Sequence, residues 1–192
     1  MAAREFGADL IGLVFAESRR RVTVEEARKI ACQTPGICKV GVFVNAPLTE
    51  VQSIARECQL DYVQLHGDES PEYCSLVGYP VIKAFSIRPG FSSEIFKGYQ
   101  ASWTLFDTFS AGQQGGTGKA FDWQEAQALV CQTPRPFMVA GGLTPDNVGE
   151  AIQILTPDGV DVSGGVETNK VKDLAKIERF IAAVRGGGRA EC

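Results

Sequence analysis

The chain has 192 residues, which is enough for one sizeable hydrophobic core but short for two ordinary domains, so we expect a single domain. Hydrophobic residues make up 44% and charged residues 22%, a composition that excludes a disordered tail protein or a collagen-like fibre. Lys and Arg total 19 against 23 Asp and Glu, so the net charge is −4, and without a basic block we expect no nucleic-acid partner.

The apolar runs and the cysteines bear on the cellular compartment. The longest apolar run covers residues 10–16, far below the ~20 residues that a membrane-spanning helix needs, so we expect no membrane span. Acidic Glu5 and Asp9 argue against a signal peptide. The six cysteines are spread along the chain without a Cys-x-x-Cys pair, and the sequence has one histidine that could serve as a further metal ligand. This pattern predicts no metal site, and it predicts reduced thiols in the cytoplasm.

Short apolar runs alternate along the chain with helical patterns. The predicted strands cover residues 10–15, 39–44, 62–66, 81–87, 103–108, 137–142 and 159–165. Among the helices, residues 1–6 resemble the end of one, and others begin at Thr23, at Asp122 with Glu125, and at Thr144 with Pro145. The last helix is predicted from about Val171 to Arg185. We therefore expect one domain over residues 1–185 and a disordered tail over residues 186–192.

The alternation of strands and helices predicts the fold class. Near-continuous apolar strands such as residues 39–44 favour a parallel sheet covered by helices. Two architectures fit this pattern, a (β/α) barrel and an open doubly wound sheet. The common barrel has eight strands, and the pattern shows only seven after residues 1–6. On the barrel interpretation, the sequence begins part-way through a unit, without the first strand and most of the first helix.

Three glycine-rich segments follow the later strands, at residues 115–119, 141–144 and 163–165. Glycines let backbone amides approach an anion closely, and in parallel barrels the loops after the last two strands commonly hold a phosphate. The alternative is that these glycines only make tight turns. The first segment is not a nucleotide-binding P-loop, because Gln113 and Ala120 replace its leading glycine and its Ser or Thr.

Four polar side chains stand where a barrel places groups that touch its substrate. Asp107 ends an apolar strand and is a candidate general acid, with a helix cap or ion pair as the alternative. Gln64 and His66 alternate along one strand and therefore share a face, although a lone histidine is more often structural. Arg20 lies in an arginine run that either grips a carboxylate or phosphate or is simply solvated.

Several segments together resemble the phosphoribosylanthranilate isomerase family of tryptophan biosynthesis. They are, in chain order, Gly7–Phe15 (GADLIGLVF), Gly41–Asn45 (GVFVN), Val63–Glu69 (VQLHGDE), Phe106–Thr108 (FDT), Gly115–Lys119 (GGTGK) with Phe121–Trp123 (FDW), Ala140–Val148 (AGGLTPDNV) and Gly159–Glu167 (GVDVSGGVE). The resemblance covers residues 2 to about 183. Motifs that occur in this order are far more specific than any single glycine loop.

This resemblance implies a TIM-type (β/α)8 barrel that catalyses an Amadori rearrangement without a cofactor. Its substrate would be the phosphosugar N-(5-phosphoribosyl)anthranilate and its product the corresponding 1-deoxyribulose phosphate. The resemblance assigns the general acid to Asp107 and places Arg20 on the anthranilate side. The substrate-binding residues it implies are Gln64, His66, Gly141, Gly142, Asp161, Ser163, Gly164 and Gly165. Gly164 departs from the second Ser that the family usually has there, which removes one hydroxyl contact to phosphate.

A larger departure concerns the general base. The family's base is a cysteine in a Lys-Ile-Cys-Gly segment on its first strand, and no such segment occurs here. We therefore expect that the natural protein starts upstream. If these 192 residues were the complete protein, we would expect it to bind phosphorylated ligands but to turn over little. The alternatives are a non-catalytic phosphate-binding barrel and, less favoured, another phosphate-barrel enzyme such as indole-glycerol-phosphate synthase. No feature of the sequence predicts an oligomeric state.

Overall fold

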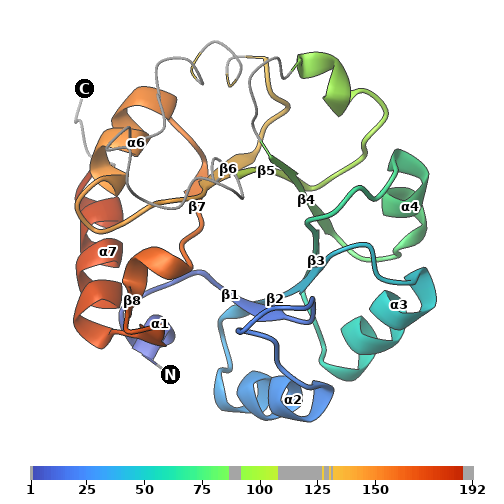
Figure 1. The fold of residues 1–192 in the computed structure, drawn as a ribbon, viewed down its shortest axis with the longest axis horizontal. Coiled ribbons are helices and arrows are strands. Elements are labelled where there is room, and N and C mark those ends of the chain that lie inside the picture. Colours follow the sequence, from blue (N-terminus) through green and yellow to red (C-terminus); the bar gives the residue numbers. More distant parts are fainter. Residues whose placement is uncertain (1, 87–91, 108–126, 128–129, 131, 188–192) are drawn as a thin grey trace. The chain divides into compact units, whose positions relative to one another are not determined.

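Strands form at all seven predicted positions in the computed structural model of the chain, and each begins within one residue of its predicted start (Figure 1). They are β1 (Leu10–Val14), β2 (Cys38–Phe43), β3 (Tyr62–Leu65), β4 (Val81–Ser86), β5 (Trp103–Asp107), β6 (Phe137–Ala140) and β7 (Gly159–Val160). The structure describes residues 2–86, 92–107, 127, 130 and 132–187.

The chain divides into two compact units. The first comprises Met1–Ala84 and Gly98–Trp103, and the second comprises Phe85–Lys97 and Thr104–Cys192. That these units together make the single domain expected over residues 1–185 stays a prediction. Each unit contains some of the predicted site residues, and the two units are described in turn.

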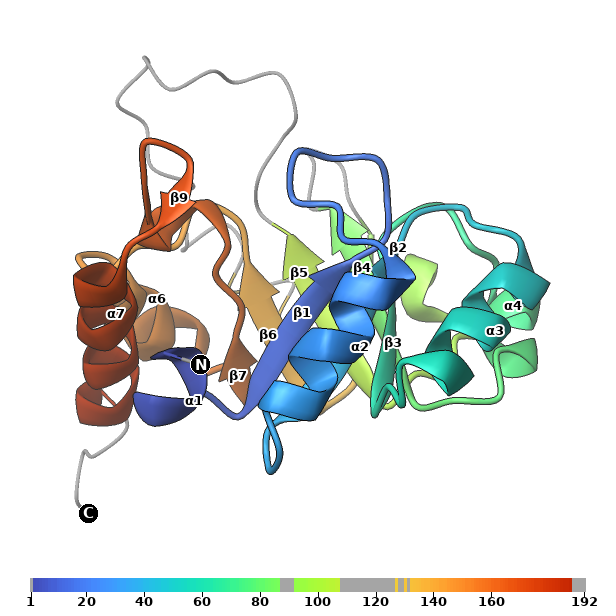
Figure 2. The same cartoon turned by 90° about the horizontal axis from the view of Figure 1, so that it is seen from below.

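In the first unit, β1, β2, β3 and the start of β4 pair in parallel. A short helix, α1 (Ala2–Glu5), precedes β1, and the helices α2 (Val24–Gln33), α3 (Leu48–Glu57) and α4 (Pro71–Leu76) follow β1, β2 and β3 and lie along one face of these strands (Figures 1 and 2). Val63 and Leu65 are fully buried. Because side chains alternate along a strand, Gln64 and the following His66 point to the other face.

The helix α2 begins where the sequence predicts. The Thr23 side chain accepts the backbone N–H of Glu26, and the Glu26 carboxylate accepts the N–H of Thr23 at 2.8 Å. This reciprocal pair satisfies two amides that the first turn of a helix leaves without a partner. The Glu26 carboxylate also accepts the Thr23 hydroxyl at 3.0 Å, and the two bonds that it accepts from Thr23 lower the pKa of Glu26. The cap fixes the point at which the chain turns from the loop after β1 into the helix.

In the second unit, β5, β6 and β7 pair in parallel. Helices α6 (Val148–Leu155) and α7 (Leu174–Gly187) pack against each other (Figure 1). Beneath the strands, the Phe106 ring meets Phe137 and Phe96 edge-on, with ring centroids 5.9 and 5.7 Å apart; Phe96 ends the short helix η1 (Ser93–Phe96). Such edge-to-face contacts add stability beyond simple burial, so these rings help to hold β5 against the start of β6.

Two predicted helix starts in the second unit are wrong. The helix expected at Thr144 and Pro145 begins at Val148, because the Asn147 side chain binds the preceding residues as a turn. The helix expected from Val171 begins at Leu174, since Val171 belongs to a hairpin of β8 (Glu167–Thr168) and β9 (Val171–Lys172). Strands β6 and β7 also end earlier than predicted, and at β6 the cause is the positive φ of Gly141 and Gly142.

Three predicted features lie outside the described residues. These are the helix start at Asp122 with Glu125, the glycine segment 115–119, and the last five residues of the expected tail, 188–192. Among the helices that the structure describes, none is long and apolar enough to cross a membrane.

Candidate active site

The second unit places Asp107 beside the first glycine loop. Asp107 is the last residue of β5 and pairs in register with Ala140, the last residue of β6, so Gly141 follows directly beside it. The N–H of Asp161, just beyond β7, donates to the carbonyl of Val139 at 2.9 Å. Because parallel strands end at the same edge of a sheet, these residues share the edge where α/β proteins bind ligands. The Asp107 carboxyl is half-buried there.

The glycine loops after β6 and β7 touch each other through their backbones. A Cβ atom on Gly165 would lie 1.7 Å from the carbonyl oxygen of Leu143 and 2.8 Å from its carbonyl carbon. No side chain fits in that space, so only glycine lets the two loops meet. Gly165 lies in the short helix η2 (Gly164–Val166), and Gly141 and Gly142 have φ values of 87° and 65°. The two predicted phosphate loops therefore form one continuous backbone surface.

Asn147 holds the loop after β6. Its Oδ1 accepts the N–H of Thr144 at 2.7 Å, and its Nδ2 donates to the carbonyl of Gly142 at 3.1 Å. Bridging side chains of this kind stabilise tight turns where the backbone has no regular partner. Sequence reasoning missed this role, although an Asn three residues after Thr144 was a signal for such a turn.

Lys172 and the hairpin β8–β9 hold the loop after β7. The Lys172 Nζ donates to the carbonyl of Ser163 at 2.7 Å and lies 3.4 Å from the carboxylate of Glu167. The N–H of Asp173 donates to the carbonyl of Val166 at 2.9 Å, and Lys176 of α7 donates to the carbonyl of Glu167 at 2.8 Å. Because these bonds reach both ends of η2, the hairpin fixes the amides of residues 164 and 165.

Asp173 makes this hairpin sensitive to acid. A hydrogen bond from the Thr168 hydroxyl at 2.7 Å and one from the N–H of Lys176 lower the pKa of Asp173 from its ordinary value of 3.8. A carboxylate whose pKa is lowered on folding stabilises the protein above its unfolded pKa, and that contribution is lost as pH falls through the folded pKa. We expect Asp173→Asn to destabilise the protein at neutral pH and progressively less below about pH 3.8.

The free energy of unfolding of the wild type and of Asp173→Asn is measured in urea. The measurement is made at neutral pH and at the lowest pH at which the wild type still folds. Thr168→Val, which removes the hydroxyl donor, should show the same pH trend at smaller size because the Lys176 bond remains. An Asp173→Asn deficit that stays constant over this pH range would contradict the assignment.

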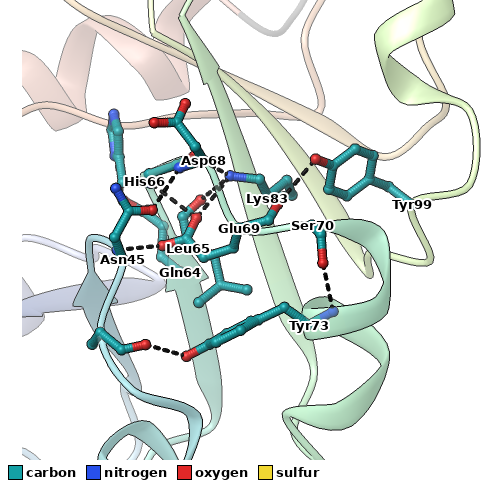
Figure 3. Close-up of polar contacts among 12 residues, drawn as sticks. Asn45, Gln64, Leu65, His66, Asp68, Glu69, Ser70, Tyr73, Lys83 and Tyr99 are labelled. Carbon is teal, nitrogen blue, oxygen red and sulfur yellow. Dashed lines mark hydrogen bonds and ion pairs between the residues drawn. The ribbon is translucent and has the colours of Figure 1, made fainter.

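The first unit brings Gln64 and His66 together. The Oε1 of the buried Gln64 lies 3.1 Å from Nδ1 of His66 (Figure 3). The His66 N–H donates to the carbonyl of Phe43 at 2.9 Å. Arg20 lies in the turn after β1, where its N–H donates to the Ser18 hydroxyl at 3.1 Å, and its side chain is half-buried. Gln64 is the next-to-last residue of β3, His66 follows β3 directly, and Arg20 lies in the turn after β1, so all three lie near the carboxyl ends of these strands.

The described cysteines do not supply a general base at this edge. Cys32 and Cys74 lie within helices, Cys58 follows α3, and Cys38 begins β2 at the opposite end of the strand. Burial raises the pKa of both Cys58 and Cys74, which disfavours the reactive thiolate. Cys131 and Cys192 lie outside the described residues. Within the part of the chain that the structure describes, no group of three His, Cys, Asp or Glu residues is arranged to hold a metal ion.

Comparison with known proteins identifies the family. Residues 1–183 match the family model described as N-(5'phosphoribosyl)anthranilate (PRA) isomerase. The chain belongs to this isomerase family. It is 46% identical over 187 residues to the N-(5'-phosphoribosyl)anthranilate isomerase of Desulforamulus reducens, with 96% of this chain and 88% of the relative covered. The enzyme of that name from Pseudomonas putida is 48% identical over 190 residues, with 96% and 91% covered.

Solved structures of the family confirm the predicted fold class, a TIM-type (β/α) barrel. A crystal structure of the phosphoribosyl anthranilate isomerase of Thermotoga maritima matches with a TM-score of 0.85 and 35% identity over 96% of this chain and 92% of that one. A structure of a phosphoribosyl anthranilate isomerase in complex with reduced 1-(o-carboxyphenylamino)-1-deoxyribulose 5-phosphate matches with a TM-score of 0.81 and 33% identity, over 96% of this chain and 91% of that one.

Proposed function

We propose that this chain binds N-(5'-phosphoribosyl)anthranilate and isomerises it to 1-(o-carboxyphenylamino)-1-deoxyribulose 5-phosphate. The observation that carries the proposal is the backbone contact of the two glycine loops at Gly165 and Leu143, beside the strand end that bears Asp107. Family membership supports it, and so does the reduced product bound in a solved relative. No step of this reaction requires a cofactor.

The joined glycine loops suit the phosphate of this substrate. Gly141, Gly142, Gly164 and Gly165 carry no side chain, so an anion can approach their backbone closely, and Ser163 adds a hydroxyl next to them. Loss of the family's second Ser at Gly164 removes a hydroxyl but keeps its amide. Asp161, at the end of β7, would orient the sugar next to these loops.

Asp107 is the proposed general acid. It would give its proton to the furanose ring oxygen while the C1–O bond breaks and the nitrogen lone pair forms C1=N. A base then removes the C2 proton, the electrons of the C–H bond form C1=C2, and the nitrogen regains its lone pair. Protonation at C1 and loss of the proton on O2 leave the ketone at C2. General acid catalysis of this kind contributes about 10²–10⁴-fold to a rate.

Three residues of the first unit have side chains whose chemistry suits the anthranilate and sugar groups of the substrate. The Arg20 guanidinium matches the anthranilate carboxylate in charge and in its two-pronged geometry. Gln64 and His66 present an amide and an imidazole that hydrogen-bond to each other and can also reach sugar hydroxyls. We further propose a cytoplasmic location, which is supported by the free thiols of Cys32, Cys38, Cys58 and Cys74.

A second candidate function is phosphate-ligand binding without turnover. The observation that favours it is that no cysteine in the described part of the chain lies at the carboxyl end of a strand, where the family's general base would act. The acid and the phosphate loops would then bind the ligand while proton removal from C2 stays slow.

Two measurements on the same protein separate these candidate functions. One is calorimetry with reduced 1-(o-carboxyphenylamino)-1-deoxyribulose 5-phosphate, and the other is an assay of isomerisation. Saturable binding with turnover supports the isomerase, and binding without turnover supports the second function. Failure to bind the reduced product, with the fold verified by circular dichroism, would refute both.

A further inference from the structure

A buried ion pair joins β4 to the loop that follows β3, the strand that contains Gln64. Lys83 of β4 is 1% exposed and Glu69, in the loop after β3, is 5% exposed. The Lys83 Nζ donates to Oε2 of Glu69 at 3.0 Å and to the backbone carbonyls of Leu65 at 3.1 Å and Gly67 at 2.6 Å (Figure 3). These bonds use the full donor capacity of an ammonium group, so the lysine is completely satisfied without water.

The Glu69 carboxylate ties the loops after β2 and β3 together. Its Oε1 accepts the N–H of Asn45 at 2.8 Å, and its Oε2 accepts the N–H of Gly67 at 3.0 Å. In return, the Asn45 side chain accepts the N–H of Asp68 at 2.8 Å. A Cβ on Gly67 would lie 2.9 Å from the Asn45 backbone nitrogen and 2.4 Å from its side-chain oxygen. The two loops therefore pack backbone to backbone around one carboxylate.

A gain in stability does not explain this arrangement well. Burying two charges costs so much desolvation that apolar residues of the same size often stabilise a protein equally or better. The neighbours of Lys83 along β4 are buried apolar residues, among which a leucine or methionine would fit the pattern. What the ion pair provides, and apolar side chains cannot, is a set of directional bonds to backbone groups.

The bonds from Lys83 to the backbone lie on both sides of His66. Leu65 and Gly67, whose carbonyls bind Lys83, are the immediate neighbours of His66, and the His66 N–H is itself bonded to Phe43. The backbone on both sides of His66 is thereby fixed. Since an amide oxygen only accepts, the 3.1 Å contact between Nδ1 of His66 and Oε1 of Gln64 favours the neutral tautomer that carries its proton on Nδ1. The position of the loop therefore places the imidazole where it can donate from Nδ1 to Gln64.

The geometry assigns to the Glu69–Lys83 pair a positioning role: it fixes the loop after β3 so that His66 and Gln64 meet the ligand in a single preformed arrangement. This inference rests on the proposed function in so far as Gln64 and His66 bind the substrate. Neither Glu69 nor Lys83 needs to touch the ligand, because both act through the backbone of residues 65–69. Preformed arrangement of this kind raises affinity by removing the entropic cost of ordering the loop on binding.

His66 is the only histidine in the sequence, so its imidazole is a unique NMR reporter. With ¹⁵N-labelled protein at a pH where the ring is neutral, the two ring nitrogen shifts give the tautomer directly. We expect the Nδ1–H form to predominate in the wild type and to give way in Glu69→Gln to the mixture that a free imidazole shows. Affinity for reduced 1-(o-carboxyphenylamino)-1-deoxyribulose 5-phosphate should fall about tenfold, the effect of one lost hydrogen bond.

Because Glu69→Gln leaves Lys83 as a buried charge without its counter-ion, the double variant Glu69→Gln with Lys83→Met serves as a second test. It removes both charges, should fold at least as well as the single variant, and should still lose the Nδ1–H preference.

The matched control is Asp61→Asn. The Asp61 carboxylate also accepts a backbone N–H, that of Lys39 at 2.7 Å, but at the opposite end of β3. It should cost stability while leaving the imidazole shifts and the affinity unchanged.

If the ring nitrogen shifts of His66 in both Glu69 variants matched those of the wild type, the positioning role would be overturned. It would also be overturned if Asp61→Asn changed these shifts as much as the Glu69 variants do. Changed shifts with unchanged affinity would overturn its link to the ligand. A wild type that binds no reduced product would contradict the proposed function instead, while the tautomer measurement still decides whether the ion pair positions His66.

Discussion

Asp107→Asn is expected to lower kcat for isomerisation by about 10²–10⁴-fold, the usual contribution of a general acid. Asn keeps the shape of the side chain at the end of β5 but has no proton that it can give to the ring oxygen. The reduced product no longer needs protonation, so its affinity should change by less than about tenfold. Single-turnover assays at saturating substrate, paired with calorimetry of the reduced product, measure the two effects separately.

Asp146→Asn provides the control for this variant. It makes the same chemical change in the same unit, on an exposed aspartate that pairs with Arg179. It should leave both kcat and affinity as they are in the wild type. Equal turnover by Asp107→Asn and the wild type would refute the acid assignment, and a parallel loss of binding and turnover would make Asp107 a binding residue instead.

The strands could be predicted from the sequence because buried strands consist of consecutive apolar residues. Each is a short apolar run, and each begins within one residue of its predicted start. Strand alternation alone also predicts that Gln64 and His66 share a face. Val63 and Leu65, which alternate with them along the chain, are fully buried on the other face. Local patterns of this kind depend only on residues next to one another in the sequence.

The supports of the site could not be predicted in the same way, because they join residues far apart in the sequence. Glu69 stands next to Asp68 in a polar segment that looks solvent-exposed, yet its partner is Lys83 on the next strand. The one available signal was a lysine inside the apolar run of β4. The hairpin after η2 was hidden for another reason: Asn169 and Lys170 take positive φ values of 51° and 67° without a glycine to mark the turn.

The glycine loops could be predicted in part, less fully than the strands but better than the supports of the site. Their positions after two successive strands indicated that both hold phosphate, but the sequence does not tell which glycine is needed for flexibility and which for space. The structure separates them: Gly142 has a positive φ with nothing within 4 Å of a Cβ, whereas Gly165 has no room for one. A requirement for space depends on the loop across from it and appears only in three dimensions.

Gly165→Ala is therefore expected to have the largest effect on ligand binding among the glycine variants. The added methyl would lie 1.7 Å from the carbonyl oxygen of Leu143, so the two loops must separate by more than an ångström. Overpacking of this kind costs about 1–3 kcal/mol of stability. Separation also removes one or two charge-assisted bonds to phosphate, so affinity for the reduced product should fall roughly 10²-fold. Calorimetry and urea unfolding measure the two losses.

Gly149→Ala is the matched control, because it adds the same methyl group to the same unit. Gly149 lies in α6, and nothing is within 4 Å of its Cβ position. Alanine there should stabilise the helix by about 0.5–1 kcal/mol and leave affinity unchanged. If Gly165→Ala bound the reduced product as tightly as Gly149→Ala does, the contact between the loops would not form the phosphate site. The proposed function would then lose the observation that carries it.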